Sequence, residues 1–305
     1  MPTPFLDNAT LLTARVVLNQ VSTALRNSPE MAQFLYVTRN GTSVVSSLVT
    51  KPRGATRFVM ISDTHNLHRK IDVPAGDVLL HSGDILLRDR GMNDPLQRGM
   101  DDLWDFNVWL GEQKRTKGFF SAFVIAGNHD TTLADLGTDK TRAVLSNAQY
   151  LYNTEIAVPG TDIRVYGTPL HLPNTAKSTN TSFQPFERGS EDLKSAYARI
   201  PKGVDVLLTH GPPTGLGQKS GDAACSELEN TLRSVEPFLH VHGHNHHGYG
   251  ASKLGRTSVI NACQLNGMFQ VTKRQLPVVM DITEDALQAH RMNLADLPSE
   301  PVAER

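Results

Sequence analysis

Cysteine is scarce in this sequence, with only Cys225 and Cys263 among 305 residues. Two cysteines exclude a disulfide framework and favour a pair of reduced, packed thiols in a cytosolic protein. No apolar run approaches the ~20 residues that cross a bilayer, and the N-terminus lacks the basic-then-apolar pattern of a secretory signal. The formal net charge is only −1, so nothing indicates a nucleic-acid polymer or a membrane surface as partner. We therefore expect a cytoplasmic protein.

The length of 305 residues alone suggests about two domains. The residues with ligand chemistry, however, run from Asp63 to His246, so a single site would draw on most of the chain. We therefore expect one large catalytic domain over residues 57–283, preceded by a helix and a β-hairpin within residues 1–56. Residues 284–305 are expected to form a C-terminal helix and tail. The sequence does not indicate an oligomeric state.

Hydrophobic periodicity and turn residues predict the other elements. Asn40-Gly41 between two β-prone runs predicts a hairpin over 34–49. Residues 171–190 have no clear period and predict a long loop, of the kind that often borders a substrate. We further expect helices over 7–27, 95–111, 139–146, 191–199 (capped by Ser190), 223–235 (capped by Asp222) and from 284, a hairpin over 156–166, and strands over 258–261 and 278–281.

One short stretch carries the first sign of chemistry. Phe58–Ile61 form an apolar run that suits a buried strand, and the run is followed by Asp63 and His65. Residues two apart in an extended chain point the same way, so both side chains can face one point beyond the strand. Taken alone, the stretch favours a turn with an idle histidine over half of a metal site.

The same design recurs four more times, with apolar runs that end in ligand-type residues, usually beside glycine. In open α/β sheets, sites lie beyond the carboxyl ends of the strands. The five ends therefore predict one shared pocket of oxygen and nitrogen ligands without thiols, a set that suits Mn, Zn or Fe. The four further strand ends offer Asp84, Asn128 with His129, His210, and His244 with His246.

In this order, the motifs resemble the five signatures of the calcineurin-like metallophosphoesterases. The finer pattern is similar to the subgroup called metallophosphoesterase domain-containing proteins. The resemblance covers roughly residues 57–281. It implies an α/β fold, a four-layer α-β-β-α sandwich of two mixed sheets flanked by helices. The matching segments are Asp63-x-His65, Gly83-Asp84, Gly127-Asn-His-Asp130, His210 and Gly243-His-x-His246.

The resemblance also implies a role for each motif residue around two divalent metal ions, with Mn preferred and Fe or Zn as alternatives. His129 would be the catalytic histidine, and Asp130 would orient it. Asp84 would bridge the two ions. The first ion would be held by Asp63, His65, Asp84 and His246, and the second by Asp84, Asn128, His210 and His244.

The function implied is hydrolysis of a small phosphodiester, for instance a cyclic nucleotide, by a hydroxide that bridges the two metals. A phosphomonoesterase or phosphoprotein phosphatase, and a metal-bound scaffold with little turnover, are the alternatives. Asn66, His68 and Arg88 follow ligand positions in loops and are our candidates for contacts with the substrate.

Overall fold

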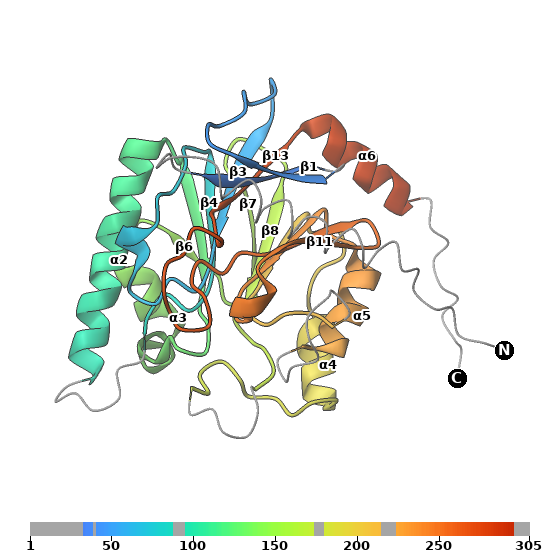
Figure 1. Ribbon diagram of the computed structural model, residues 1–305. Helices are drawn as coiled ribbons and strands as arrows, with labels where there is room; N and C mark the ends of the chain where they lie inside the picture. The colour runs from blue at the N-terminus through green and yellow to red at the C-terminus, as the bar shows by residue number, and fades with distance from the viewer. Residues whose placement is uncertain (1–32, 39–40, 88–94, 174–179, 215–223, 296–305) are drawn as a thin grey trace, which may run out of the picture.

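The computed structural model describes residues 33–38, 41–87, 95–173, 180–214 and 224–295. In these ranges two mixed β-sheets lie face to face with helices outside them (Figure 1). The larger sheet has the strand order β2 (Gly41–Val45), β1 (Phe34–Thr38), β13 (Val278–Ile282), β3 (Thr56–Ile61), β4 (Val78–Ser82), β5 (Ser121–Ile125), β6 (Gln149–Tyr150). The smaller sheet has the order β11 (Gly250–Leu254), β12 (Thr257–Asn261), β10 (Leu239–His242), β9 (Val206–Thr209), β8 (Arg164–Thr168), β7 (Thr154–Ala157).

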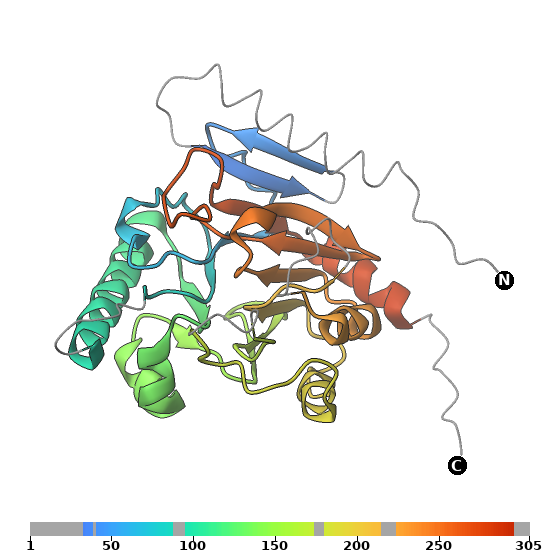
Figure 2. The ribbon, with the colours of Figure 1, turned by 60° about the horizontal axis from the view of Figure 1, so that its bottom comes forward.

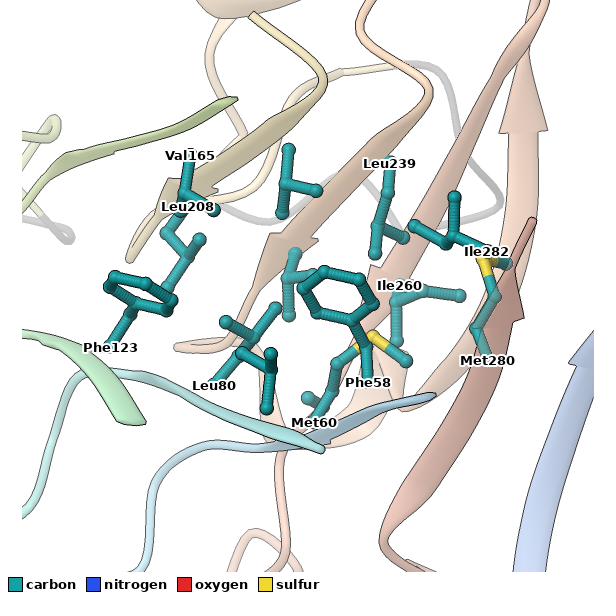
Figure 3. Packing of buried hydrophobic residues seen from close by; sticks show 14 of the residues in the cluster. Phe58, Met60, Leu80, Phe123, Val165, Leu208, Leu239, Ile260, Met280 and Ile282 are labelled. Atoms are coloured by element: carbon teal, nitrogen blue, oxygen red, sulfur yellow. The ribbon is translucent and has the colours of Figure 1, made fainter. Parts of the chain in front are cut away.

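The central strands of the larger sheet are buried along their whole length because both faces of the sheet are covered there. On β3, Phe58 and Met60 belong to the cluster between the two sheets, whereas Val59 and Ile61 pack toward the helices. This alternation follows from the two-residue period of a strand. Figure 3 shows the inner cluster, in which Phe58 and Met60 meet side chains such as Leu239 and Ile260 from the smaller sheet.

Helices complete the outer layers. Helix α2 (Pro95–Lys117) and helix α3 (Thr131–Val144) cover the larger sheet, and α4 (Glu191–Ala198) and α5 (Ser226–Val235) cover the smaller one. Helix α6 (Glu284–Ala295) follows β13, and η1 (His68–Lys70) and η2 (His246–Gly248) are short 3-10 turns. The predicted four-layer α-β-β-α sandwich is therefore confirmed. None of the helices in the described ranges has the length and apolarity needed to span a bilayer.

The predicted N-terminal hairpin is present and lies at one edge of the molecule, where Figure 2 shows its two blue strands. Strand β1 pairs in parallel with β13, so β1 and β2 extend the larger sheet. Arg57 on β3 and Asp281 on β13 form a buried ion pair of 2.7 Å, and Tyr36 of β1 donates to the same carboxylate. The domain boundary at residue 56 stays a prediction, and the expected helix 7–27 and tail lie outside the described residues.

Several predicted helix boundaries are wrong. Helix α2 does not stop at Gly111 but continues to Lys117, and the absent side chain of Gly111 makes room for Asn147. The helix expected over 139–146 corresponds to the second part of α3, which ends at Val144, because the non-helical backbone of Gly137 (φ 74°, ψ 172°) divides α3 in two. Helix α5 begins at Ser226 with Cys225 as its cap, because Cys225 Sγ accepts a hydrogen bond from Leu228 N. Asp222, the cap we expected, lies outside the described residues.

Candidate metal centre

The ligand-type residues come together because of the sheet topology. Strands β3, β4 and β5 are parallel neighbours in one sheet, and β9 and β10 are parallel neighbours in the other. Their carboxyl ends therefore meet at one end of the sandwich. The two sheets are joined there by a hydrogen bond of 2.8 Å between His210 Nδ1 and Ser82 O.

One group of ligand atoms gathers around the end of β3. Asp63, His65 and His246 each place one donor atom within 4.8 Å of the other two. His65 Nε2 lies 3.4 Å from His246 Nε2, and His246 Nε2 lies 3.5 Å from Asp63 Oδ1. A carboxylate and two imidazoles converging on one point match the first predicted metal position.

A second group shares Asp84 with the first. Oδ2 of Asp84 lies 3.8 Å from His65 Nε2 and 3.3 Å from His210 Nε2. His210 Nε2 is also 3.1 Å from Asn128 Oδ1 and 3.2 Å from His244 Nδ1. Asp84 therefore stands between the two groups, where a carboxylate that bridges two cations would have to stand.

The tautomers of three histidines fit a metal. Nδ1 of His65, His210 and His246 lies 3.1, 2.8 and 2.8 Å from the backbone oxygens of Leu86, Ser82 and Leu265. A carbonyl oxygen only accepts, so each Nδ1 carries the proton and the lone pair of Nε2 is left for the centre. Histidines that bind metals are oriented in the same way by a second partner. The chemistry of this donor set thus fits two divalent ions.

The backbone around the ligands is strained. Asp63, His65, Asp84 and His244 have φ values of 53°, 41°, 53° and 66°. Non-glycine residues seldom adopt this left-handed region, and such strain gathers at functional sites. Gly243 allows the tight approach, since a Cβ at this position would clash with Asp63 Oδ2.

Charge is strongly coupled at the centre. Burial lowers the pKa of His210, but the adjacent Asp84 carboxylate outweighs it and raises this pKa to about 9. Burial likewise opposes ionisation of Asp84, yet the neighbouring His210 keeps the pKa of Asp84 well below its ordinary value. Burial lowers the pKa of His65 to about 4, so this ring is neutral at pH 7. A metal site requires ionised carboxylates and neutral imidazoles, so a metal ion would have to displace the second proton of the His210 ring.

His129 lies beside this centre, but Asp130 does not orient it as expected. The His129 ring packs against His65 with 4.7 Å between ring centroids. The Asp130 carboxylate instead accepts hydrogen bonds from Leu86 N and Gly127 N, at 2.8 and 2.7 Å. Asp130 thus ties the loop after β4 to the loop after β5, because its two oxygens are turned toward backbone donors.

Three residues that the strand-end pattern missed lie at the centre. Asn180 Nδ2 is 3.0 Å from His129 Nε2. Cys263 Sγ donates to Asp63 Oδ2 at 3.2 Å. Phe269 packs on His65, His129 and His246 with centroid distances of 4.7, 5.8 and 5.2 Å. Only Cys263 carried a usable signal, since it follows the apolar run of β12.

A further histidine, His171, reaches the second group from the loop after β8. It forms a cluster with His210 and His244 whose donor atoms lie within 4.8 Å of one another. Its own nitrogens are already engaged, since Nδ1 lies 2.8 Å from Pro169 O and Nε2 2.9 Å from Gln184 Nε2. His171 therefore packs beside the ligands instead of offering a lone pair to the centre.

The suggested substrate contacts remain predictions. The Asn66 amide donates to Asp102 Oδ2 at 2.8 Å. His68 is buried against Phe106 and Trp109 and pairs with Asp105. Both side chains are thus engaged with α2. Arg88 lies outside the described residues.

Comparison with known proteins decides what this geometry represents. A family model described as calcineurin-like phosphoesterase matches residues 56–248, a range that includes every predicted ligand. The chain belongs to the calcineurin-like phosphoesterase family. The resemblance seen in the motifs is thereby confirmed, and the His and Asp clusters of this phosphoesterase are candidate metal sites of the family.

Relatives and a solved structure agree with this placement of the phosphoesterase. Metallophosphoesterase domain-containing protein 1 of Homo sapiens is 34% identical over 266 residues, covering 76% of this chain and 72% of that protein. The protein of the same name from Mus musculus gives the same values. One crystal structure matches with a TM-score of 0.50 at 15% identity, covering 68% of this chain and 91% of its own, a likeness of fold alone.

Proposed function

We propose that this phosphoesterase hydrolyses a small phosphodiester with the help of two divalent metal ions, and that both ions are preferably manganese. The observation that carries the proposal is the position of Asp84 between two groups of ligand atoms. One carboxylate shared by two such groups supports a two-metal centre over a single structural ion.

Asp63, His65, Asp84 and His246 would hold one ion, and Asp84, Asn128, His210 and His244 the other. When bound, the ions would neutralise phosphoryl oxygens and supply a water nucleophile at neutral pH. Asn128 contributes an amide oxygen and no charge, which limits the negative charge that an anionic substrate meets. His129 would donate a proton to the leaving oxygen, a role worth ~10²–10⁴-fold in rate.

Two features favour a diester over a monoester. Among the described residues, the carboxylates of Asp63 and Asp84 lie 3.3 to 3.8 Å from histidine nitrogens and form no ion pair with a lysine or arginine. A monoester carries more charge than a diester and would gain more from such cations. Phe269, 38% exposed, also places an aromatic ring beside His129, and an organic substituent of a diester could pack on it.

The test is to compare chromogenic mono- and diesters with the protein loaded with manganese, iron or zinc. We expect metal-dependent turnover, with kcat/KM higher for the diester and highest with manganese. A higher kcat/KM for the monoester would replace the proposal with a phosphomonoesterase. If elemental analysis shows that the protein holds two metals and neither ester is hydrolysed, the protein would be a metal-bound scaffold with little turnover.

A further inference from the structure

We propose that Asn180 is a positioning residue for His129. This inference rests on the proposed function, in which His129 protonates the leaving group. The Asn180 amide nitrogen lies 3.0 Å from Nε2 and 3.4 Å from Nδ1 of the His129 ring. Asn180 thus takes the role that we expected for Asp130, which is to hold the His129 ring. Phe269 packs on the same ring.

The segment that carries Asn180 is fixed to the metal centre at several points. The Asn128 amide donates to Asn180 O at 3.5 Å, and Ser182 Oγ donates to Thr131 Oγ1 at 3.3 Å. His171, beside the second ligand group, donates its backbone N–H to Phe183 O at 3.1 Å. The first two contacts tie residues 180 and 182 to the segment that carries His129, and the third ties Phe183 to the loop after β8, so the amide of Asn180 is held in place before a substrate arrives.

An amide suits this position physically. Without a partner, an imidazole rotates about its Cβ–Cγ bond, and a proton donor misplaced by 1 Å can lower a rate ~10²-fold. A hydrogen bond with Asn180 opposes that rotation in both forms of the ring, because the amide N–H donates to a neutral ring nitrogen and the amide oxygen, after the amide turns over, accepts from the protonated ring. Because the amide is neutral, it adds no negative charge beside the anionic substrate.

Removing the Asn180 amide should therefore lower the rate most for substrates whose leaving group must be protonated. p-Nitrophenolate departs readily without a proton, whereas an alkoxide needs one. We expect Asn180→Ala to lower kcat about 10- to 100-fold for a phosphodiester with an alcohol leaving group. For a p-nitrophenyl diester we expect a change of less than about threefold. KM and metal content should stay as in the wild type.

Thr181→Ala is the matched control, because Thr181 is the exposed neighbour on the same segment. It should leave both substrates unaffected. An equal loss on both substrates in Asn180→Ala, or a loss of bound metal measured by elemental analysis, would assign Asn180 a purely structural role and overturn the proposal. Unchanged kinetics on both substrates would overturn it as well.

A double-variant cycle gives a second test. If Asn180 acts only through His129, then Asn180→Ala adds no further loss in a His129→Ala background. A full additional loss in that background would show that Asn180 acts independently and would sink the inference. Failure of the proposed function gives a different result, because the metal-loaded wild type would then hydrolyse neither diester. That result would overturn this inference as well.

Discussion

The backbone N–H of His129 donates a hydrogen bond of 2.8 Å to Oδ1 of Asp84. The other oxygen of that carboxylate lies 3.3 Å from His210 Nε2. One side chain thus fixes the loop of the predicted proton donor and stands between the two ligand groups. Asp84 and His129 are therefore coupled in structure, although their predicted roles differ, and substitutions should separate those roles.

Asp84→Ala should remove metal binding and activity together, because both ligand groups lose their shared oxygen. We expect activity to fall by more than the ~10–100-fold loss seen when only the supporting partner of a ligand is removed. Elemental analysis and steady-state kinetics measure the two effects. Asp135→Ala, an exposed carboxylate on α3, is the control. Full activity in Asp84→Ala would rule out the ligand assignment.

His129→Ala should keep the metals and lose turnover. Its ring is not part of either ligand group, so the metal content should match the wild type while kcat falls ~10²–10⁴-fold. The backbone N–H that contacts Asp84 is retained in this variant. If elemental analysis showed that His129→Ala binds no metal, His129 would be a ligand and not the proton donor.

Gly243→Ala should weaken metal binding although it replaces no ligand. The new Cβ would clash with Asp63 Oδ2 and Ser62 Oγ, so the carboxylate must move. We expect metal affinity to fall ~10–100-fold, as for other disturbed ligand supports. Gly160→Ala is the control, since φ is +75° and its Cβ would meet nothing within 4 Å. That variant should lose about 1–2 kcal/mol of stability and keep its metal affinity.

Asp281→Ala should destabilise the fold strongly. It leaves Arg57, whose side chain is 7% exposed, without its carboxylate partner, and breaking a buried pair costs about 3–5 kcal/mol. Urea unfolding monitored by circular dichroism measures the loss. The double variant Arg57→Met with Asp281→Leu should lose less, because no unpaired charge remains. Equal losses of unfolding free energy in the two variants would mean that the unpaired charge of Arg57 is not the cause of the destabilisation.

His81 should make the fold sensitive to acid. Burial lowers the pKa of His81 to about 3, against 6.5 for an exposed histidine, while its Nε2 lies 3.0 Å from Thr64 Oγ1. As the pH falls, His81 therefore takes up a proton in the unfolded chain before it does so in the folded protein. The contribution of neutral His81 to the free energy of unfolding is complete above pH 6.5 and is lost as pH falls toward 3. The free energy of unfolding changes through this one group by at most about 1.4 kcal/mol per pH unit. His81→Gln should reduce the slope between pH 7 and pH 5, and His247→Gln, at an exposed histidine, should not.

The gathering of the candidate ligands could be predicted from the sequence because every one of them follows an apolar run. Five strand ends with such residues imply one edge of a sheet. The direction of the Asp63 and His65 side chains does not follow from the two-residue period of a strand, because φ is 53° and 41° at these residues and the backbone there is not extended. The hairpin over 34–49 and the cap at Ser190 could also be predicted, because both depend on residues close in sequence. Helix ends such as that of α2 could not, since packing of Gly111 against Asn147 overrides the local stop signal.

The sequence by itself determined the chemistry of this protein: which side chains could bind metal and which strand ends carry them. Only the tertiary structure decided which partner each side chain takes. Asn180 contacts His129 and Phe269 contacts His65 across loops with no periodic pattern, and Asp130 turns to Leu86 and Gly127. Such pairings depend on where the chain returns in space, and no local spacing in the sequence encodes that position.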